Sequence, residues 1–412
     1  MLHRVDLTPK DPDLYRRVVD AKVIAELERL AAPLQGARVL QVNATAYGGG
    51  VSTLLRSLVP LYRGLGLDVD WRVMPGTPDF FAVTKGLHNA LQGAAFDLTP
   101  ERRELYLSHN REVAAALGGE GRYDLVVVHD PQPAAIRHFS DGVGARWVWR
   151  CHIDTSHPDP AALAFLEPLV AQYDALVYTM DAFVPAELRG RPLRIIAPAI
   201  DPLSPKSLPL PAELIAGIVE WAGVSLDRPL ISQISRFDPW KDPLGVIEVF
   251  RRVRERVPGV QLALVGQMAL DDPQGWAMLR QIQDETRDDD DIHVLTNFTG
   301  IDDVGVNAFQ RASSVVLQKS IREGFGLVVS ESLWKGTPVV AGRTGGIPMQ
   351  MPEGVGGYLV DTAEECVERT VELLRDRAAA ARLGEAGRRH VREHFLITRL
   401  LADELRLLGS LC

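Results

Sequence analysis

Residues 37–50 read Ala37-Arg-Val-Leu-Gln-Val-Asn-Ala-Thr-Ala-Tyr-Gly-Gly-Gly50. A short apolar run that ends in a glycine-rich loop is typical of a buried strand. Residues 51–62 then carry apolar side chains at helical spacing, and residues 67–73 return to the composition of a strand. Together these segments predict a β-loop-α-β unit, the building block of doubly wound α/β folds.

Four more strand-like runs follow in the first half of the chain, separated by segments long enough to hold crossover helices. They cover residues 125–128, 147–149, 175–178 and 194–196. A polar lead-in over residues 13–30 is expected to be helical. This half is therefore predicted to be α/β, with a mainly parallel sheet.

Prolines cluster between residues 198 and 229, which marks the expected junction of two domains. Beyond it the alternation restarts, and residues 378–408 have the apolar spacing of a helical pair. Strands are expected over residues 230–234, 260–265, 292–295, 314–317, 338–341 and 357–360, and helices over 243–257, 274–287 and 327–335 with one near 307. Two tandem Rossmann-like doubly wound domains result, with the ligand expected in a cleft between them, where the strands end.

Size and composition agree with this architecture and exclude several functions. A chain of 412 residues exceeds what one core usually serves, so two domains are expected. The net charge of −9 argues against a sequence-independent nucleic-acid binder, which needs surplus cations. The three cysteines lie far apart and are expected to be free thiols. No apolar run has the length of a signal peptide or membrane span, so a cytoplasmic protein without a membrane partner is expected.

Two glutamates flank a glycine-rich helix start in Glu323-Gly-Phe-Gly-Leu-Val-Val-Ser-Glu331. Glycines at a helix start let a ligand approach the backbone, and the unpaired N–H groups there suit a phosphate. Glu331 could then accept hydrogen bonds from a ribose, while Glu323 faces the ligand. Alternatively, the segment is only a helix cap, in which Glu323 is a solvated loop residue and Glu331 complements the helix dipole.

Two cations follow the first predicted strand of the second half, in Ser235-Arg-Phe-Asp-Pro-Trp-Lys-Asp242. Arg236 and Lys241 could neutralise a leaving diphosphate, the first as a fork and the second as a point charge. Alternatively, they are surface cations paired with Asp238 and Asp242, which on frequency alone is the favoured interpretation. The residues by themselves leave both interpretations open.

Polar residues also follow three predicted strands of the first half. The glycines at 48–50 follow the first of them. Their loop lacks the spacing of a dinucleotide site, and a tight turn alone would be enough to explain them, so they decide little by themselves. Asp130 lies in His129-Asp-Pro-Gln132 and His152 in Arg150-Cys-His-Ile-Asp154, at strand ends where such folds bind ligands. A histidine in such a place is more often a structural hydrogen-bond donor than a catalyst.

The acidic run Asp288-Asp-Asp-Asp291 precedes a predicted strand. It resembles a cation site only superficially and is expected to be a solvated loop. The histidines, cysteines and aspartates elsewhere do not have the spacing of a zinc site. No metal site is therefore predicted.

Four stretches together resemble the retaining GT-B glycosyltransferases and, within them, the glycosyltransferring trehalose synthases. They are Tyr47-Gly-Gly-Gly-Val-Ser52, Arg150-Cys-His-Ile-Asp154, Ser235-Arg-Phe-Asp-Pro-Trp-Lys241 and Gln318-Lys-Ser-Ile-Arg-Glu-Gly-Phe-Gly-Leu327. The resemblance covers nearly the whole chain. It implies an acceptor-binding domain over residues 1–205, a nucleotide-sugar donor domain over 206–385, and a C-terminal helix over 386–412 that crosses back to brace the first domain.

The resemblance also implies roles for single residues. Those implied in catalysis are Glu323, Arg236, Lys241 and His152. Those implied in binding the donor are Gly49, Gly50, Arg236, Lys241, Gly324, Phe325, Gly326, Leu327, Val328 and Glu331, with Glu323 on the donor sugar and Glu331 on the ribose. Those implied in binding the acceptor are Gly49, Asp130 and His152.

The implied reaction joins the glucose of UDP- or ADP-glucose to free glucose, giving α,α-trehalose, and can run backwards. Related enzymes of this fold meet the diphosphate with cations and helix dipoles, so no cofactor or metal is expected to be required, although magnesium can travel with the nucleotide. A homodimer is also implied. The alternatives are a retaining trehalose phosphorylase, another GT-B transferase, a nucleotide-sugar epimerase, and a nucleotide-sugar-binding protein without activity.

Overall fold

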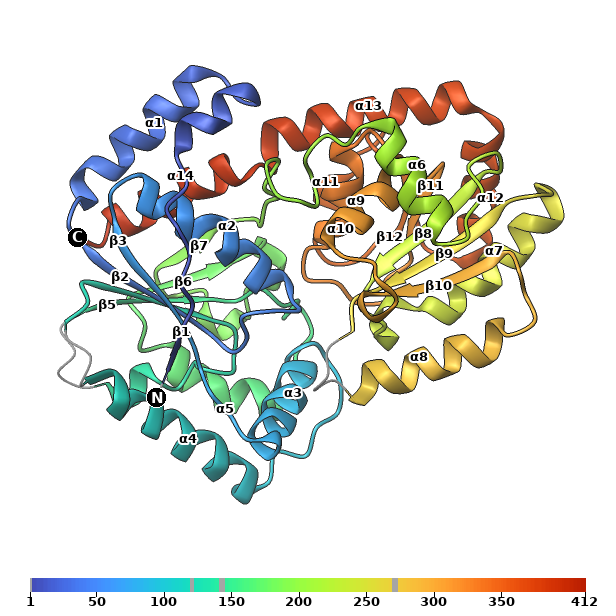
Figure 1. The fold of residues 1–412 in the computed structure, drawn as a ribbon. Helices are drawn as coiled ribbons and strands as arrows, with labels where there is room; N and C mark the ends of the chain where they lie inside the picture. The colour runs from blue at the N-terminus through green and yellow to red at the C-terminus, as the bar shows by residue number, and fades with distance from the viewer. Residues whose placement is uncertain (1, 119–121, 141–144, 269–272) are drawn as a thin grey trace. The chain divides into compact units, whose positions relative to one another are not determined.

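The structure, a computed structural model, describes residues 2–118, 122–140, 145–268 and 273–412. It divides into two compact units, each built on its own sheet (Figure 1). The first unit holds residues 1–198 and 397–412, and the second holds residues 199–396. Both are Rossmann-like α/β units, as predicted.

Over the described residues, the first unit has a seven-stranded sheet in the order β1-β3-β2-β4-β5-β6-β7. Every neighbouring pair is parallel except the antiparallel pair β1–β3. The strands are β1 (His3–Arg4), β2 (Arg38–Asn43), β3 (Asp68–Val73), β4 (Leu125–His129), β5 (Arg146–Arg150), β6 (Ala175–Tyr178) and β7 (Leu193–Ile195). All five residues of β4 are buried, as expected for a central strand of a parallel sheet covered on both faces.

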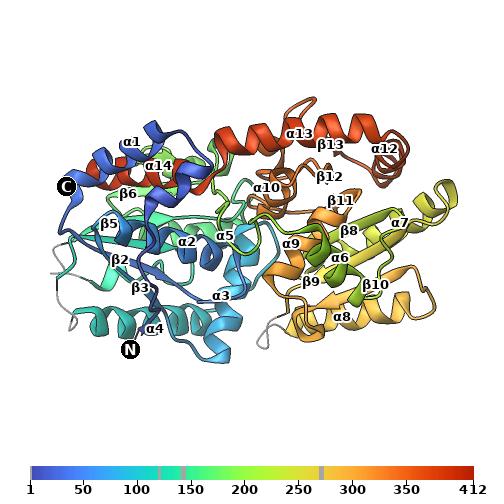
Figure 2. The same ribbon diagram turned by 45° about the horizontal axis from the view of Figure 1, so that its top comes forward.

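Helices cover the two faces of this sheet. They are α1 (Ala21–Ala31), α2 (Gly50–Gly64), α3 (Pro78–Leu91), α4 (Pro100–Gly118), α5 (Pro160–Val170) and α14 (Ile397–Gly409). The last of these comes from the C-terminus and lies beside α1 in both ribbon views (Figures 1 and 2). The C-terminal helix of the chain therefore belongs to the first unit.

The second unit has a fully parallel sheet in the order β10-β9-β8-β11-β12-β13. The strands are β8 (Leu230–Ser235), β9 (Gln261–Gly266), β10 (Ile292–Thr296), β11 (Val315–Gln318), β12 (Val339–Gly342) and β13 (Gly357–Val360). The helices are α6 (Ala212–Trp221), α7 (Pro243–Arg256), α8 (Pro273–Thr286), α9 (Asp303–Ala312), α10 (Leu327–Trp334), α11 (Ile347–Gln350), α12 (Ala363–Arg375) and α13 (Arg377–His394). Phe250 of α7 and Phe309 of α9 are fully buried in two separate apolar clusters.

The lead-in over residues 13–30 is helical, as expected, but it consists of two helices instead of one continuous segment. A 3-10 helix over Pro12–Arg17 comes first, and α1 begins only after Asp20. The backbone of Asp20 is extended, with φ −61° and ψ 147°, and its carboxylate accepts the N–H of Lys22 at 2.8 Å. A capping aspartate in this geometry starts a new helix, which interrupts the helical pattern read from the sequence.

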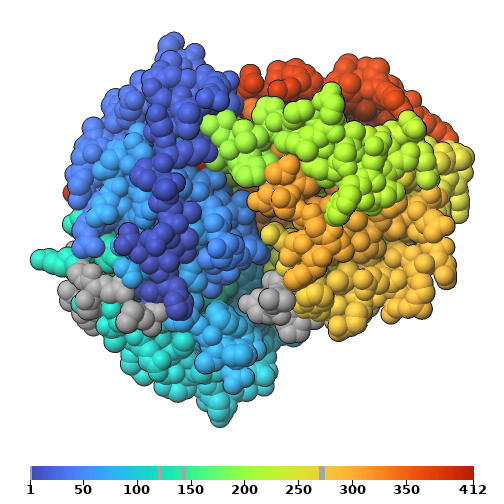
Figure 3. All heavy atoms as spheres, viewed as in Figure 1, coloured from blue at the N-terminus to red at the C-terminus, as the bar shows by residue number. Residues whose placement is uncertain are grey.

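The units divide at other residues than those expected from the sequence. Residues 199–205 belong to the second unit, where Asn307 of α9 donates hydrogen bonds of 2.8 Å to the carbonyls of Pro205 and Leu208. Figure 3 shows this segment, in light green, lying over the orange part of the same unit. At the other end α13 stays in the second unit, so the part of the chain that returns to the first unit starts at residue 397 instead of 386.

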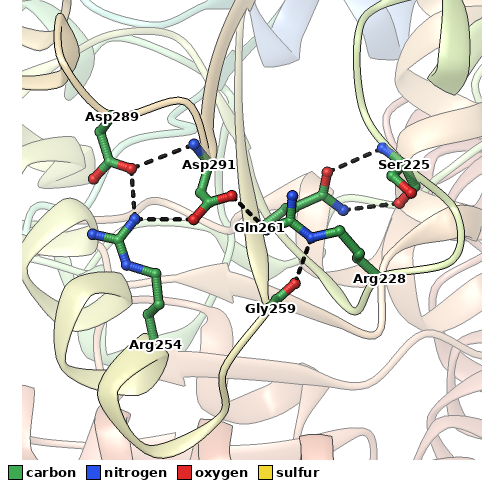
Figure 4. A network of polar contacts seen from close by, with 7 residues as sticks. All are labelled: Ser225, Arg228, Arg254, Gly259, Gln261, Asp289 and Asp291. Atoms are coloured by element: carbon green, nitrogen blue, oxygen red, sulfur yellow. Dashed lines mark hydrogen bonds and ion pairs between the residues drawn. The ribbon is translucent and has the colours of Figure 1, made fainter.

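The acidic run at 288–291 is a loop with Asp288 and Asp290 exposed, as expected, but its other two carboxylates are paired. Arg254 reaches Asp289 at 2.5 Å and Asp291 at 3.2 Å, and Arg228 also pairs with Asp291 (Figure 4). The Arg228 guanidinium is the main cause that lowers the pKa of Asp291. The network connects the starts of three strands. Arg228 precedes β8 and Asp291 precedes β10, and Gln261, the first residue of β9, forms hydrogen bonds with the N–H and the carbonyl of Ser225. It therefore lies at the opposite end of the strands from the predicted site.

The expectations about free cysteines and about membrane-spanning segments can be compared with the structure. Cys151 and Cys366 are buried free thiols, and Cys412 is an exposed one. Within the described ranges, no helix combines the length and apolar character needed to cross a membrane. Burial raises the pKa of both Cys151 and Cys366, which keeps these thiols protonated at neutral pH.

Candidate functional site

One group of predicted residues gathers at an edge of the second unit's sheet. β8 and β11 are parallel neighbours, so the segments that follow them meet where both strands end. Lys241 ends a 3-10 helix over Pro239–Lys241 after β8, and Glu323 follows β11. We name Arg236, Lys241, Glu323 and residues 324–331 the second-unit cluster.

The two loops of this cluster are tied to each other through the backbone. The N–H of Ile321 donates to the carbonyl of Trp240 at 2.8 Å. Gln233, which lies on β8 beneath them, donates its side-chain amide to the carbonyl of Lys241 at 2.6 Å. The positions of Lys241 and Glu323 are therefore fixed by main-chain hydrogen bonds as well as by their side chains.

Lys241 and Glu323 form an ion pair of 2.5 Å between Nζ and Oε2. Both side chains are largely buried, at 16% and 10% exposure. The interpretation of Lys241 as a surface cation paired with Asp242 is wrong, because Asp242 pairs with Lys319 instead. Burial removes water from the Lys241–Glu323 pair, which strengthens its electrostatic interaction.

Glu323 is held by three donors that all reach the same carboxylate oxygen. Besides Lys241, the side-chain amide of Gln318 and the hydroxyl of Ser320 each lie 3.2 Å from Oε2. Gln318 also donates to Ser320 at 2.9 Å. Glu323 is therefore a pre-oriented carboxylate and not a solvated loop residue, and its other oxygen takes part in none of these three contacts.

Arg236 differs from Lys241 in its surroundings. Its side chain is 40% exposed, and one guanidinium nitrogen lies 3.6 Å from a carboxylate oxygen of Asp238. This is the surface pair that the alternative interpretation expected. An exposed ion pair of this length restrains an arginine weakly, so Arg236 can turn towards a ligand at little cost.

The glycines between the two glutamates shape the start of α10. Gly326 is the N-cap of α10 and has a left-handed φ of 83°, which a residue with a side chain adopts at a cost. It provides no side-chain cap, so the first N–H groups of the helix, including those of Leu327 and Val328, receive no acceptor from it. Phe325 packs its ring 5.5 Å from that of Phe395. The N–H groups at the start of α10 are therefore suited to binding an anion.

Sequence reasoning missed the residues that shape this loop from behind. Gly345 has φ 54°, and a Cβ there would lie 1.6 Å from the carbonyl oxygen of Glu323. Gly346 donates its N–H to Gly324 at 3.1 Å, and Gln350 donates to the carbonyl of Phe325 at 2.5 Å. The glycine pair directly before Ile347-Pro348, just after a strand, is the sequence signal that could have pointed to this turn.

Glu331 is a buried residue of α10 with polar neighbours. Its carboxylate accepts the side-chain amide of Gln310 at 3.2 Å, and its backbone carbonyl accepts Lys335 Nζ at 2.9 Å. Burial lowers the pKa of Lys335 to about 7. Glu331 lies beyond the first turn of α10, so complementing the helix dipole does not account for it.

The other group of predicted residues lies where β2, β4 and β5 end in the first unit. We name Gly49, Gly50, Asp130 and His152 the first-unit cluster. β4 and β5 are parallel neighbours, with His129 opposite Arg150 in the register. Asp130 follows His129 directly, and His152 follows Arg150 after Cys151, which brings both to the same edge of the sheet.

His152 is one half of a buried histidine pair that the sequence did not suggest. Its Nε2 lies 2.9 Å from Nδ1 of His129, whose Nε2 lies 2.7 Å from Oε1 of Gln41. With the Gln41 oxygen accepting from His129 Nε2, the neutral His129 accepts from His152 at Nδ1. Burial lowers the pKa of both histidines, that of His129 to about 3, so both rings are neutral at pH 7.

Asp130 holds an uncommon backbone conformation, with φ 64°. Its N–H donates to the carbonyl of Arg150 at 2.9 Å, and its Oδ1 accepts the N–H of His152 at 2.8 Å. Its own carbonyl accepts the indole N–H of Trp149 at 2.9 Å. Burial raises the pKa of Asp130 to about 7, so the carboxyl can donate as well as accept near neutral pH.

The glycine loop that precedes α2 is held from one side. Arg56 donates to the carbonyl of Ala46 at 3.0 Å and lies 4.2 Å over the ring of the exposed Tyr47. Gly48 has φ 77°, which agrees with the tight-turn interpretation. A Cβ on Gly49 would meet no atom within 4 Å, so the space beside it is open.

Two family models match this chain. The model of the trehalose synthase N-terminal domain matches residues 41–185, and the model of glycosyl transferases group 1 matches residues 221–390. A trehalose synthase from Rubrobacter xylanophilus is 51% identical over 414 residues, which cover 100% of this chain and 99% of that protein. The chain belongs to the trehalose synthase family.

Members of the trehalose synthase family are hexosyltransferases, so the predicted enzyme class is confirmed. A trehalose phosphorylase from Pleurotus pulmonarius is more distant, with 28% identity over 95% of this chain and 59% of that protein. A solved E. coli structure described as trehalose-6-phosphate bound with UDP-2-fluoro glucose has a TM-score of 0.73 at 15% identity, covering 91% of this chain and 99% of that chain. This likeness shows the fold, and the GT-B prediction is confirmed.

In this trehalose synthase family chain, the predicted residues form one cluster in each unit. Side-chain groups that hold them in place come from positions that the sequence left without a role, namely Gln41, His129, Gln318, Ser320 and Gln350. Among the residues that the structure describes, no group of three or more histidine, cysteine, aspartate or glutamate side chains could hold a metal ion.

Proposed function

We propose that this protein is a retaining glucosyltransferase that makes α,α-trehalose from a nucleoside-diphosphate glucose and free glucose, reversibly. The observation that carries the proposal is the buried Lys241–Glu323 pair beside the uncapped start of α10, in a chain of the trehalose synthase family. A cation, a pre-oriented carboxylate and free helix N–H groups are what a diphosphate-linked sugar requires.

The second-unit cluster would bind the donor. Lys241 and Arg236 would meet the diphosphate together with the N–H groups of residues 324–328, and Glu323 would bind hydroxyls of the transferred glucose. Glu331 would accept hydrogen bonds from the ribose. A UDP-sugar analogue is bound in the E. coli structure of the same fold, which supports a nucleotide-linked donor, and the donors that we propose are UDP- and ADP-glucose. These cations and the dipole of α10 leave no step that requires a metal, although magnesium could accompany the nucleotide.

The first-unit cluster would bind the acceptor. Asp130 and neutral His152 offer hydrogen-bonding groups for sugar hydroxyls, and the open space beside Gly49 gives the substrates access to the backbone there and at the neighbouring Gly50. His152 would lie beside the transferred glucose. A neutral sugar needs hydrogen-bonding groups and no counter-charge, which the buried neutral rings provide.

Retention would follow from substitution on the face that the diphosphate leaves. The bond from the anomeric carbon to the phosphate oxygen breaks, the bond to the acceptor oxygen forms, and the departing phosphate oxygen takes the acceptor proton. Lys241, Arg236 and the N–H groups at α10 stabilise the charge that develops on the leaving group.

The test is to incubate the protein with trehalose and either a panel of nucleoside diphosphates or inorganic phosphate. We expect nucleotide-glucose and glucose only with a nucleoside diphosphate. Cleavage that needs inorganic phosphate would identify a trehalose phosphorylase instead. In a separate incubation with nucleotide-glucose alone, its consumption without an acceptor would identify an epimerase. The absence of turnover in all of these incubations would leave a binding protein.

We also propose a cytoplasmic homodimer that has no membrane partner. The net charge of −9 does not favour an anionic membrane surface. Light scattering of the purified protein tests the oligomeric state, and a molar mass of one chain would contradict the dimer. Fractionation of cells that produce the protein tests the location.

A further inference from the structure

A buried ion pair connects the C-terminal helix α14 to strand β5 within the first unit. Arg150 ends β5 and Glu404 lies on α14, and their side chains are only 4% and 8% exposed. The hydroxyl of Tyr62, on α2, donates to the same carboxylate. The contact joins residues that are more than 250 positions apart in the chain.

The elements joined by Glu404 are those that carry the first-unit cluster. His152 lies two residues after the end of β5, and the carbonyl of Arg150 accepts the N–H of Asp130 at 2.9 Å. α2 starts at Gly50, so Tyr62 belongs to the helix that follows the glycine loop. Glu404 is therefore a common partner of β5 and α2, two of the elements that carry the first-unit cluster, whereas Asp130 follows β4.

A buried arginine without a partner is strongly unfavourable, because the protein interior cannot replace the water around its charge. Arg150 lies close enough to the histidine pair and to Asp130 for its charge to act on all three, and it lowers the pKa of both histidines. A shift of the Arg150 side chain would therefore change the field at the residues that the proposed acceptor contacts.

A second set of contacts, made by Arg399, also holds α14 in place within the first unit. Arg399 donates to the carbonyls of Ala197 and Pro198 at 2.8 and 2.9 Å and pairs with Asp403 at 3.0 Å. These contacts hold the helix against the last residues of the first unit's main segment. Glu404 follows on the next residue, so its position is set by contacts on its own helix.

We propose that Glu404 is a positioning residue for the acceptor, which it serves by holding Arg150 in place behind Asp130 and His152. The proposal rests on the function proposed for the first-unit cluster. The C-terminal helix is then part of the acceptor-binding machinery and more than a brace. Glu404 touches neither substrate, so its effect should appear in acceptor binding and leave nucleotide binding unchanged.

The first experiment compares Glu404→Gln with Glu26→Gln. Glu26 forms an exposed pair of 2.9 Å with Arg406 of the same helix, which makes it a matched control on the surface. We expect Glu404→Gln to raise KM for glucose at least tenfold, while the dissociation constant for the nucleoside diphosphate changes less than twofold. Glu26→Gln should change neither. Equal changes in both constants for Glu404→Gln would overturn the proposal.

A second variant separates positioning from stability. Arg150→Met, Tyr62→Phe and Glu404→Leu together replace the buried polar contact by apolar side chains, which proteins often tolerate without loss of stability. If Glu404 and Arg150 only support the fold, this variant should regain both the melting temperature and the KM for glucose of the wild type. We expect the melting temperature to recover and the KM for glucose to stay raised. Recovery of both would overturn the proposal.

A third measurement does not depend on the proposed reaction. Histidines labelled with nitrogen-15 report the ring environment of His129 and His152 by NMR in the absence of substrate. We expect these two ring signals to shift in Glu404→Gln and to stay in place in Glu26→Gln. Unshifted signals would contradict the positioning role, whereas a wild type that makes no trehalose would contradict the proposed function alone.

Discussion

The two clusters differ in the charge of their buried side chains. In the second unit, Lys241 and Glu323 form a close ion pair, and exposed Arg236 lies near Asp238. In the first unit, burial keeps His129 and His152 neutral and raises the pKa of Asp130 to about 7. One cluster keeps full charges, and the other is built from groups whose charge has been suppressed.

The difference follows from what each cluster is proposed to bind. A nucleoside diphosphate brings negative charge, which permanent cations and helix N–H groups can meet. A free sugar brings only hydroxyls, and a full charge buried beside them would cost desolvation without gaining an ionic partner. Four substitutions test this contrast, in order of decreasing expected effect.

Glu323→Gln removes the charge from the best-held carboxylate of the second-unit cluster. We expect kcat to fall by about 10²- to 10³-fold, the range for losing one pre-organised polar group at a reacting centre. Circular dichroism should show an unchanged fold. Glu364→Gln, at an exposed surface pair with Arg252, is the control and should keep wild-type kcat. Full activity in Glu323→Gln would refute the role on the donor sugar.

Gly345→Ala pushes a methyl group into the carbonyl of Glu323, so it tests whether the second-unit cluster is held by its backbone. Gly354→Ala is the matched control, because Gly354 also has a positive φ, of 76°, but a Cβ there meets nothing within 4 Å. Strain alone should cost Gly354→Ala about 1–2 kcal/mol. We expect Gly345→Ala to lose about 3 kcal/mol or more of unfolding free energy, by urea titration, together with most of its activity. Equal losses in the two variants would contradict the steric argument.

Asp130→Asn should stabilise the protein above neutral pH. The pKa of Asp130 is raised to about 7 in the folded protein, whereas an unfolded aspartate ionises near pH 4. The unfolded state therefore loses its proton first, and stability falls as pH rises from about 4 to 7. Asparagine tolerates the left-handed backbone and still accepts the N–H of His152. Replacing the carboxyl should raise the free energy of unfolding by about 2 kcal/mol at pH 8 and change it little at pH 4.

Urea titrations of wild type and Asp130→Asn at pH 4 and pH 8 measure this difference. Asp154→Asn serves as the control, because Asp154 is buried nearby in the same unit but caps Ser156 through its side chain. That variant should lose stability at both pH values. A gain for Asp130→Asn that is the same at pH 4 and pH 8 would show that the carboxyl is not held protonated.

Asp291→Asn should have the smallest effect and leave catalysis unchanged. Arg228 lowers the pKa of Asp291, so the pair contributes stability above the ordinary pKa of an aspartate and loses it as pH falls below that value. Because the side chains of Asp291 and Arg228 are partly exposed, we expect Asp291→Asn to lower the free energy of unfolding by about 1 kcal/mol at pH 7. The loss should vanish near pH 2, and kcat should match the wild type. A change in KM for either substrate would connect this end of the sheet to the clusters.

Much of the fold could be predicted from the sequence, because short apolar runs between helical segments recur along the whole chain. The strands of the second unit lie within one or two residues of their expected bounds, as β13 over residues 357–360 shows. The helical break at Asp20 was missed, since an aspartate inside a polar segment does not reveal whether its side chain caps a helix. β1, two residues long, is too short to give a pattern.

The sequence by itself determined the family, the two α/β units and the residues that carry the resemblance, because glycines, charged residues and apolar runs at fixed spacing are visible along one chain. Only the tertiary structure decided how those residues are held. Gln318 with Ser320, the His129–Gln41 pair, the turn at Gly345 and the Arg150–Glu404 contact all depend on side chains from separate elements. Burial keeps His152 neutral, and burial is a property of packing that spacing along the chain does not contain.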